Sequence, residues 1–232
     1  EMTDEIFHKG LGSVAERNFR PHVNCVNITP DQKYLCAVDL GVDQVKIYKF
    51  NHETGKTTLV DMLRCELESA PRIIKFSPDG RFAYLICELK NYISVYSYKD
   101  GPRGPVFELL QSISTLNDYH SSGSAACVLR FSRDWKYVLC SNAGDNSIGI
   151  FKIDRETGKL EKICILPISG DYPKAADFFP DNRHIMSLNH ETNTMTIFKI
   201  NYEKKYFSMW GKPLKVETPN CILVSEIEKL PG

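Results

Sequence analysis

The chain has 232 residues, of which 42% are hydrophobic and 25% are charged, and its formal net charge is zero. This composition is typical of a globular protein, and the neutral balance argues against a nucleic-acid partner, which needs a basic excess to neutralise phosphates. No apolar run approaches the roughly 18 residues of a membrane span, and the start "EMTDEIFHKG" lacks the basic-then-apolar order of a signal peptide.

The first part of the chain predicts short strands separated by turns. An apolar run at 25–28 is followed by a Pro-Asp turn and a second run at 34–38. A polar loop then leads to the alternating segment "VKIYKF", and the Gly-containing turn "ETGKTT" leads to a fourth segment. Val, Ile, Tyr and Phe dominate these runs, and helical periodicity is absent. The pattern predicts four antiparallel strands.

The same order recurs three more times along the chain. The turns carry Asp31, Asp79, Asp134 and Asp181, at spacings of 48, 55 and 47 residues. The alternating segments carry Tyr48, Tyr96, Phe151 and Phe198, at the same spacings of 48, 55 and 47 residues. The turn aspartates and the aromatic residues are independent markers, and their identical spacings indicate a structural repeat.

Four strands per repeat of about 50 residues predict an all-β fold, a β-propeller of four-stranded antiparallel blades. We expect a single propeller domain, or a fragment of one, over residues 1–232. The complete repeats cover about 22–69, 70–122, 123–171 and 172–217, and a partial fifth covers 218–232. Because open sheet edges need cover, either residues 1–21 close a small ring or further blades lie upstream.

Eight cysteines raise the question of disulfides or zinc: Cys25, Cys36, Cys65, Cys87, Cys127, Cys140, Cys164 and Cys221. No two of them have C-x-x-C spacing, and most fall within apolar strand-like runs such as "YVLCS". Buried, reduced thiols are therefore expected, with no metal site, and a cytoplasmic location follows.

Alignment of the repeats selects the candidate site residues. Seven residues before each turn Asp, the chain has Asn24, Arg72, Cys127 and Lys174, with Asn220 in the partial repeat. Because the second strand of each repeat runs antiparallel to the first, it ends on the face where these residues lie. At that end the repeats place Leu40, Glu88, Ala143 and His190. Arg72 and Glu88 are therefore predicted to converge at one mouth of the central channel. The alternative is an ordinary ion pair on the surface, worth under about 1 kcal/mol.

At these residues the chain resembles the seven-bladed β-propeller lactonases, the family of propeller-type 6-phosphogluconolactonase. The matching segments are "RPHVNCVNITPDQKYLCAVDLGVDQVKIYKF", "APRIIKFSPDGRFAYLICELKNYISVY" and "AGDNSIGIFKIDRETGKLE". The loop "GLGSVAERNFRPH" is similar to the family's Gly-rich segment before a His-x-His motif. The resemblance covers what looks like the C-terminal two-thirds of a member, and it implies that two to three N-terminal blades are missing from this chain.

The resemblance also implies roles for particular residues. Arg72 and Glu88 match the family's arginine and glutamate directly, and His22 matches the first histidine of His-x-His. The second histidine falls on Asn24, and a later arginine falls on Lys174. Asparagine in place of the histidine removes a group suited to proton transfer. Lysine in place of the arginine keeps the positive charge but cannot form the two parallel hydrogen bonds of a guanidinium.

By this resemblance we expect a lactone hydrolase that acts on a small anionic lactone or sugar acid such as 6-phosphogluconolactone. Glu88, His22 and Arg72 would be catalytic, and Arg72, Lys174 and Asn24 would bind substrate. No metal or organic cofactor, nucleic acid or membrane partner is implied. The alternative is a non-catalytic propeller that binds small molecules or proteins, which the residues Asn24, Ile73 and Cys87 favour.

Overall fold

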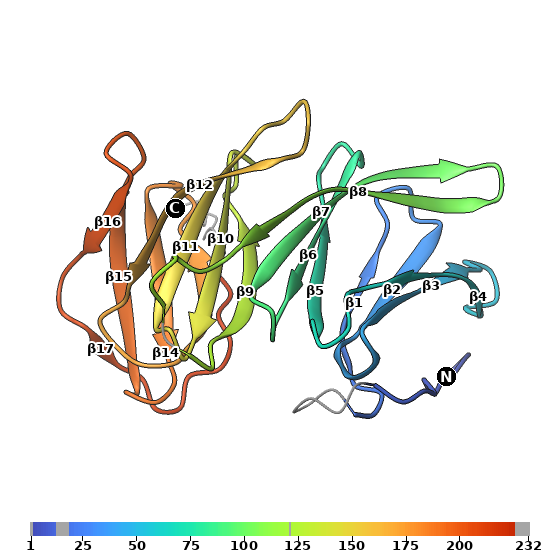
Figure 1. The fold of residues 1–232 in the computed structure, drawn as a ribbon, viewed down its shortest axis with the longest axis horizontal. Coiled ribbons are helices and arrows are strands. Elements are labelled where there is room, and N and C mark those ends of the chain that lie inside the picture. The colour runs from blue at the N-terminus through green and yellow to red at the C-terminus, as the bar shows by residue number, and fades with distance from the viewer. Residues whose placement is uncertain (1, 13–18, 121, 226–232) are drawn as a thin grey trace, which may run out of the picture. The chain divides into compact units, whose positions relative to one another are not determined.

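The computed structural model describes residues 2–12, 19–120 and 122–225, which are built almost entirely of β-strands (Figure 1). Within these ranges one short 3-10 turn, η1 (Leu40–Val42), is the only helical element. No helix of the described chain is long and apolar enough to cross a membrane. The all-β prediction is therefore confirmed. Much of the Gly-rich segment at 10–17 and the end of the predicted fifth repeat lie outside the described residues.

Four antiparallel sheets follow one another along the chain, each with its strands in sequence order. The first sheet consists of β1 (Val23–Ile28), β2 (Tyr34–Asp39), β3 (Gln44–Phe50) and β4 (Thr57–Arg64). The second consists of β5 (Pro71–Phe76), β6 (Phe82–Cys87), β7 (Tyr92–Gly101) and β8 (Gly104–Ser114). The third consists of β9 (Ala125–Phe131), β10 (Tyr137–Ala143), β11 (Ser147–Ile153) and β12 (Leu160–Pro167). The fourth consists of β13 (Pro173–Phe178), β14 (His184–Asn189), β15 (Thr194–Asn201) and β16 (Tyr206–Met209), and the short β17 (Leu214–Lys215) also pairs with β15.

Each sheet lies within one of the four predicted complete repeats and forms one propeller blade. Residues 218–225, the described part of the predicted fifth repeat, contain no strand. A first strand needs a second strand as its hydrogen-bonding partner, and this stretch pairs with none among the described residues.

The chain divides into two compact units. One holds the first and second sheets together with the turn Glu156–Lys159, and the other holds the third and fourth sheets. Inside the first unit, β1 and β5 are neighbours, and β9 and β13 are neighbours inside the second. The first strands of the two sheets within each unit therefore lie beside one another.

The repeated Asp belongs to the turn between the first and second strands of each sheet. The hydroxyls of Thr29, Ser77 and Ser132 donate to Asp31, Asp79 and Asp134 at 2.6, 2.6 and 2.7 Å. Burial opposes ionisation of Asp79, but hydrogen bonds from Ser77 and Arg81 together lower its pKa to about 2. Asp79 thus stays charged and holds the register of its hairpin, and the same hydroxyl contact at Asp31 and Asp134 explains why the residue repeats.

The repeated aromatic residue is a core residue in every sheet. Tyr48, Tyr96, Phe151 and Phe198 are at most 7% exposed. In the first unit, Tyr96 packs in one cluster with Ile47 and Ile74, so the two sheets share a core. In the second unit, Phe198 packs in a cluster with Leu139, Ile150 and Phe178. Each such buried side chain stabilises the fold by about 1.5–3 kcal/mol.

A residue with left-handed backbone closes the loop between the second and third strands of each sheet. These residues are Asp43, Asn91, Asn146 and Asn193, with φ of 54°, 52°, 53° and 53°. Asp and Asn tolerate this conformation better than other residues with a Cβ. The recurrence shows that the loop geometry is part of the repeat.

In the loops of the first, third and fourth sheets, this side chain also holds the backbone that follows the sheet. Asp43 accepts hydrogen bonds from the amides of Glu68 and Ala70, both at 2.8 Å. Asn146 accepts one from the amide of Tyr172 at 2.8 Å, and Asn193 one from that of Thr218 at 2.7 Å. Ala70 and Tyr172 directly precede β5 and β13. The loop of one sheet therefore fixes where the first strand of the next begins.

Asp43→Ala should lower the free energy of unfolding by about 2–4 kcal/mol, because it leaves the buried amide of Ala70 unpaired and puts alanine in a left-handed conformation. Asp43→Asn is the matched control. It keeps a carbonyl oxygen and tolerates the backbone, so its loss should stay under about 1 kcal/mol. Urea unfolding measures both variants, and equal losses would contradict this role for the side chain.

All eight cysteines are unpaired thiols. Burial raises the pKa of Cys36, Cys87 and Cys140 to about 12, whereas Cys221 is exposed. Only the thiolate is strongly nucleophilic, so these three buried thiols should be inert in the folded protein.

A thiol reagent at about pH 8 should modify Cys221 first in the folded protein and should reach Cys36, Cys87 and Cys140 only on unfolding. Peptide mapping by mass spectrometry identifies the order of labelling. In denaturant all eight thiols should titrate. A count of six or fewer would show that disulfides are present.

Candidate functional site

The first strand of every sheet contains a β-bulge at the same place. In the second sheet Pro71 pairs with Cys87 and Ile73 with Ile86, so that Arg72 is the extra residue. The corresponding extra residues are Asn24 in β1, Cys127 in β9 and Lys174 in β13. These are the four residues that the repeat alignment selected. A bulge redirects a side chain and occurs often beside active sites.

Arg72 and Glu88 meet in the first unit as predicted. An Arg72 guanidinium nitrogen, Nη1, forms an ion pair with the Oε2 oxygen of Glu88. The Arg72 side chain is 24% exposed, whereas that of Glu88 is 1% exposed. The Glu88 amide donates to the carbonyl of Ala70 at 2.8 Å, which ties the end of β6 to the start of β5. This pair is half-buried, so it is not the solvated surface pair that was the alternative.

Asn24 reaches the same place from β1. Its amide nitrogen donates to the main-chain carbonyl of Arg72 at 3.4 Å. Three residues further along β1, Asn27 donates to the carbonyl of Ile74 at 3.1 Å. Two amide side chains therefore connect β1 with the backbone of β5. Asn24 therefore contributes to the placement of Arg72.

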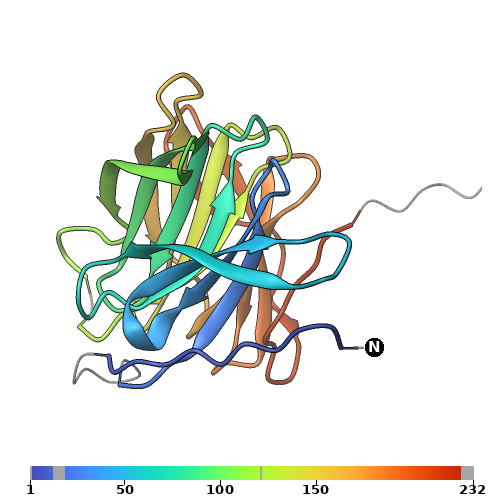
Figure 2. The same cartoon turned by 90° about the vertical axis from the view of Figure 1, so that its right-hand side faces the viewer.

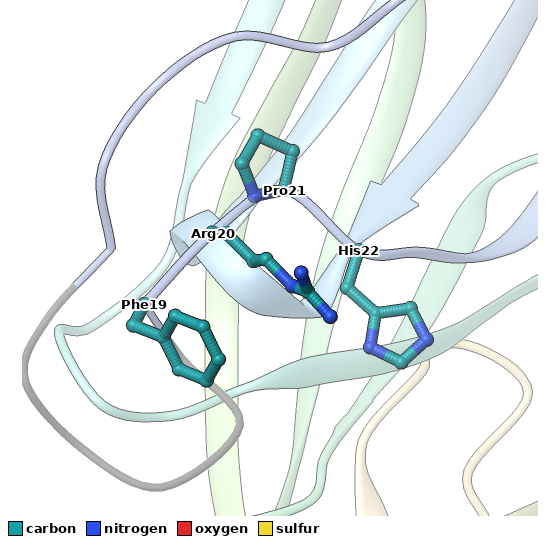
Figure 3. Close-up of a pocket in the computed structure, with 4 residues that line it drawn as sticks. All are labelled: Phe19, Arg20, Pro21 and His22. Atoms are coloured by element: carbon teal, nitrogen blue, oxygen red, sulfur yellow. The ribbon is translucent and has the colours of Figure 1, made fainter.

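His22 lies just before β1 and lines a hollow of about 500 Å³ together with Phe19, Arg20 and Pro21 (Figure 3). The side chains of Arg20 and His22 project to the same side of the chain (Figure 3). The His22 amide donates to Asp39 Oδ1 at 2.7 Å, and its carbonyl accepts from Leu40 at 3.0 Å. An imidazole and a guanidinium side by side can transfer a proton and hold an anion.

Arg20 and Asp39 were not among the residues predicted from the sequence. Arg20 stands in the quoted segment "RPH", two residues before His22, and this spacing was the available signal. Nothing in the sequence marked Asp39 as a site residue, because a carboxylate at the end of an apolar strand can equally well be exposed to solvent or buried.

The remaining predicted position belongs to the second unit. Lys174 is the bulge residue of β13 and is half-buried. In the corresponding place of β9, the Cys127 thiol donates to the carbonyl of Ala125 at 3.3 Å. In the described residues no three His, Cys, Asp or Glu side chains are grouped as a metal site would require.

The family model described as "Lactonase, 7-bladed beta-propeller" matches residues 1–224. The chain therefore belongs to the seven-bladed β-propeller lactonase family, as the sequence segments predicted. It is 36% identical over 223 residues to an uncharacterized protein of Lactococcus lactis subsp. cremoris (strain MG1363), an alignment that covers 96% of this chain and 64% of that protein.

Two further relatives have described activities of their own. The chain is 27% identical over 218 residues to the 6-phosphogluconolactonase of Bacillus subtilis (strain 168), covering 94% of this chain and 61% of that enzyme. The structure of the periplasmic gluconolactonase of Pseudomonas aeruginosa matches with a TM-score of 0.83 at 25% identity, over 92% of this chain and 60% of that one. The chain thus spans about three fifths of the length of these relatives.

Arg72→Met should lower the free energy of unfolding by about 3 kcal/mol, because it removes the positive charge of Arg72 from beside the buried Glu88 carboxylate. Glu88→Gln should cost only about 1 kcal/mol, since the more exposed guanidinium can be hydrated instead. Chemical denaturation measures both. Equal losses would mean that the two charges are equally solvated, contrary to their exposed fractions.

Proposed function

We propose that the protein hydrolyses a sugar lactone that carries an anionic group, with 6-phosphogluconolactone as the model substrate. Family membership supports the reaction class, and the Bacillus subtilis relative supports this substrate. The single observation that carries the proposal is the half-buried ion pair between Arg72 and Glu88 at the bulge of β5. It presents a cation and a carboxylate at one point, as acyl transfer to water requires.

Arg72 is the group of this pair that a ligand meets first, because its side chain is 24% exposed and Glu88 is only 1% exposed. A guanidinium in a partly desolvated place stabilises negative charge strongly. In the proposed reaction, Arg72 stabilises the oxyanion that forms when water attacks the lactone carbonyl. As the guanidinium turns toward the substrate, a carboxylate oxygen of Glu88 becomes available to that water.

Glu88 then accepts a proton from the attacking water, and the new bond forms between the water oxygen and the carbonyl carbon. Collapse of the tetrahedral intermediate breaks the bond to the ring oxygen, which takes up a proton and leaves as a hydroxyl. We assign the transfer of that proton to His22, because its side chain is exposed and lines the hollow. The product is the open-chain hydroxy acid, and the proposed reaction consumes only water.

The anionic substituent of the substrate needs a cation of its own, because Glu88 already neutralises Arg72. Arg20 supplies one in the hollow that His22 lines. By the family resemblance we also propose that Lys174, the bulge residue of β13 in the second unit, binds an anionic group. Asn24 adds an amide beside Arg72.

A second candidate is a non-catalytic propeller that binds an anionic small molecule. The burial of Glu88 favours it, because a carboxylate held by arginine and shielded from water serves to orient that arginine. In this case Glu88 would contribute to affinity and not to a chemical step.

Glu88→Gln distinguishes the two candidates when hydrolysis of 6-phosphogluconolactone is followed by release of acid. If Glu88 is the base, kcat should fall about 100-fold while KM changes little, because the amide keeps the shape but cannot take a proton. Arg72→Ala should lower kcat/KM by about 30-fold to 1000-fold through lost charge stabilisation.

Lys75→Ala is the matched control, since it removes a cation from the same strand three residues beyond Arg72 and should leave turnover within about twofold. No turnover in the unaltered protein, with 6-phosphogluconate still bound and binding lost in Arg72→Ala, would establish the non-catalytic candidate. Unchanged kinetics in both Glu88→Gln and Arg72→Ala would contradict the site itself.

A further inference from the structure

Asp39, the last residue of β2, is a fully buried carboxylate with three partners in the first unit. Its Oδ2 oxygen lies 2.6 Å from Nδ1 of His8. Its Oδ1 oxygen accepts from the amide of His22 at 2.7 Å and from that of Gly41 at 3.1 Å. A carboxylate that is 0% exposed is stable only when it is paired and hydrogen-bonded in this way.

His8 belongs to the N-terminal arm, residues 2–12, which runs as an extended segment along one end of the first sheet (Figure 2). Its side chain is 5% exposed, and its second nitrogen, Nε2, lies 3.0 Å from the hydroxyl of Tyr48. Because a carboxylate only accepts, Nδ1 of His8 must carry the proton that points to Asp39. Burial, reinforced by Asp39, raises the pKa of Tyr48, so that the phenol keeps its proton and can donate to Nε2.

Gly41 shows independently how closely the chain before β1 lies against η1. A Cβ at this position would come within 1.7 Å of the Arg20 carbonyl oxygen and 3.0 Å of the His22 amide nitrogen. Only glycine permits this approach. The amide and the carbonyl of His22 are also both hydrogen-bonded, to Asp39 and to Leu40. The backbone of His22 is therefore held from three directions.

The acceptor of the His22 amide differs from that of the equivalent residues in the second, fourth and fifth repeats. Ala70, Tyr172 and Thr218 each donate an amide hydrogen to an Asp or Asn in the loop of the sheet before them. His22 donates instead to Asp39 of its own sheet, and Asp39 is in turn held by the arm through His8. The acceptor that places His22 thus depends on a residue that precedes the whole first sheet.

We propose that Asp39 is a positioning residue for His22, and that His8 fixes the Asp39 carboxylate so that the N-terminal arm is an integral part of the candidate site. The consequence for catalysis rests on the proposed lactonase function, in which His22 transfers a proton. The placement of the His22 backbone does not rest on it and can be measured separately.

The test compares His8→Leu, which removes both ring nitrogens, with His8→Asn, whose amide nitrogen can replace Nδ1 as donor to Asp39. In His8→Leu, amide hydrogen exchange at His22 should accelerate about 10-fold to 100-fold, as expected for loss of a hydrogen bond to a charged group. His8→Asn should restore exchange to within about threefold. kcat for 6-phosphogluconolactone should follow the same order, with about a 10-fold loss in His8→Leu.

Thr57→Val is the matched control for general loosening of the arm. The Thr57 hydroxyl donates to Asp4, another residue of the arm, at 2.8 Å, and that contact does not involve Asp39. This variant should leave exchange at His22 unchanged. If His8→Leu does not fold, Asp39→Asn replaces it, because the amide keeps one acceptor oxygen but loses the charge, and exchange at His22 should again accelerate.

Unchanged exchange at His22 in both His8→Leu and Asp39→Asn would overturn the proposal. So would a uniform acceleration over β1 to β4 that His8→Asn does not rescue, since that result describes a fold-stabilising contact only. Accelerated exchange confined to the segment around His22, in a protein without lactone turnover, would support the positioning role and contradict the proposed function alone.

Discussion

The hydrogen bond that a left-handed Asp or Asn accepts from the backbone amide following its sheet is the contact on which this fold depends. Asp43, Asn146 and Asn193 each fix the residues that follow their own sheet. Sheets packed only through apolar faces could slide, because hydrophobic contact is non-directional. A buried N–H bonded to a carboxylate or amide oxygen is directional and costly to leave unpaired. This contact therefore sets where the first strand after it starts.

The position of the first strand in turn decides what its bulge presents. One extra residue in β5 turns Arg72 out of the alternation of the strand, and the end of β6 places Glu88 beside it. The four sheets share this geometry but carry amide, guanidinium, thiol and ammonium groups at the bulge. The β-bulge is thus a repeated feature of the backbone, and the type of side chain at the bulge determines the chemistry of each copy.

The described chain before the first sheet is held by a different contact. His22 precedes β1 and donates its amide hydrogen to Asp39 of its own sheet, and His8 is a second hydrogen-bonding partner of Asp39. Burial of three polar groups in one network is favourable only because each has a partner. The candidate site therefore combines a β-strand bulge, a strand end and an N-terminal arm, three elements whose partners are far apart in the sequence.

By itself, the sequence determined the repeat, the number of strands in each blade and the residues at the bulges. Turn aspartates and buried aromatic residues are local requirements of a hairpin and a core, and they recur with the same spacing wherever the hairpin recurs. Alignment of the copies therefore selected Arg72 and Glu88 without any structure. Only the tertiary structure showed that Glu88 is buried against a half-exposed Arg72, that Asn24 donates to the backbone of β5, and that Asp39 and His8 hold His22. Burial and hydrogen-bond partners depend on segments that are distant in the chain, and one residue's type and spacing carry no information about them.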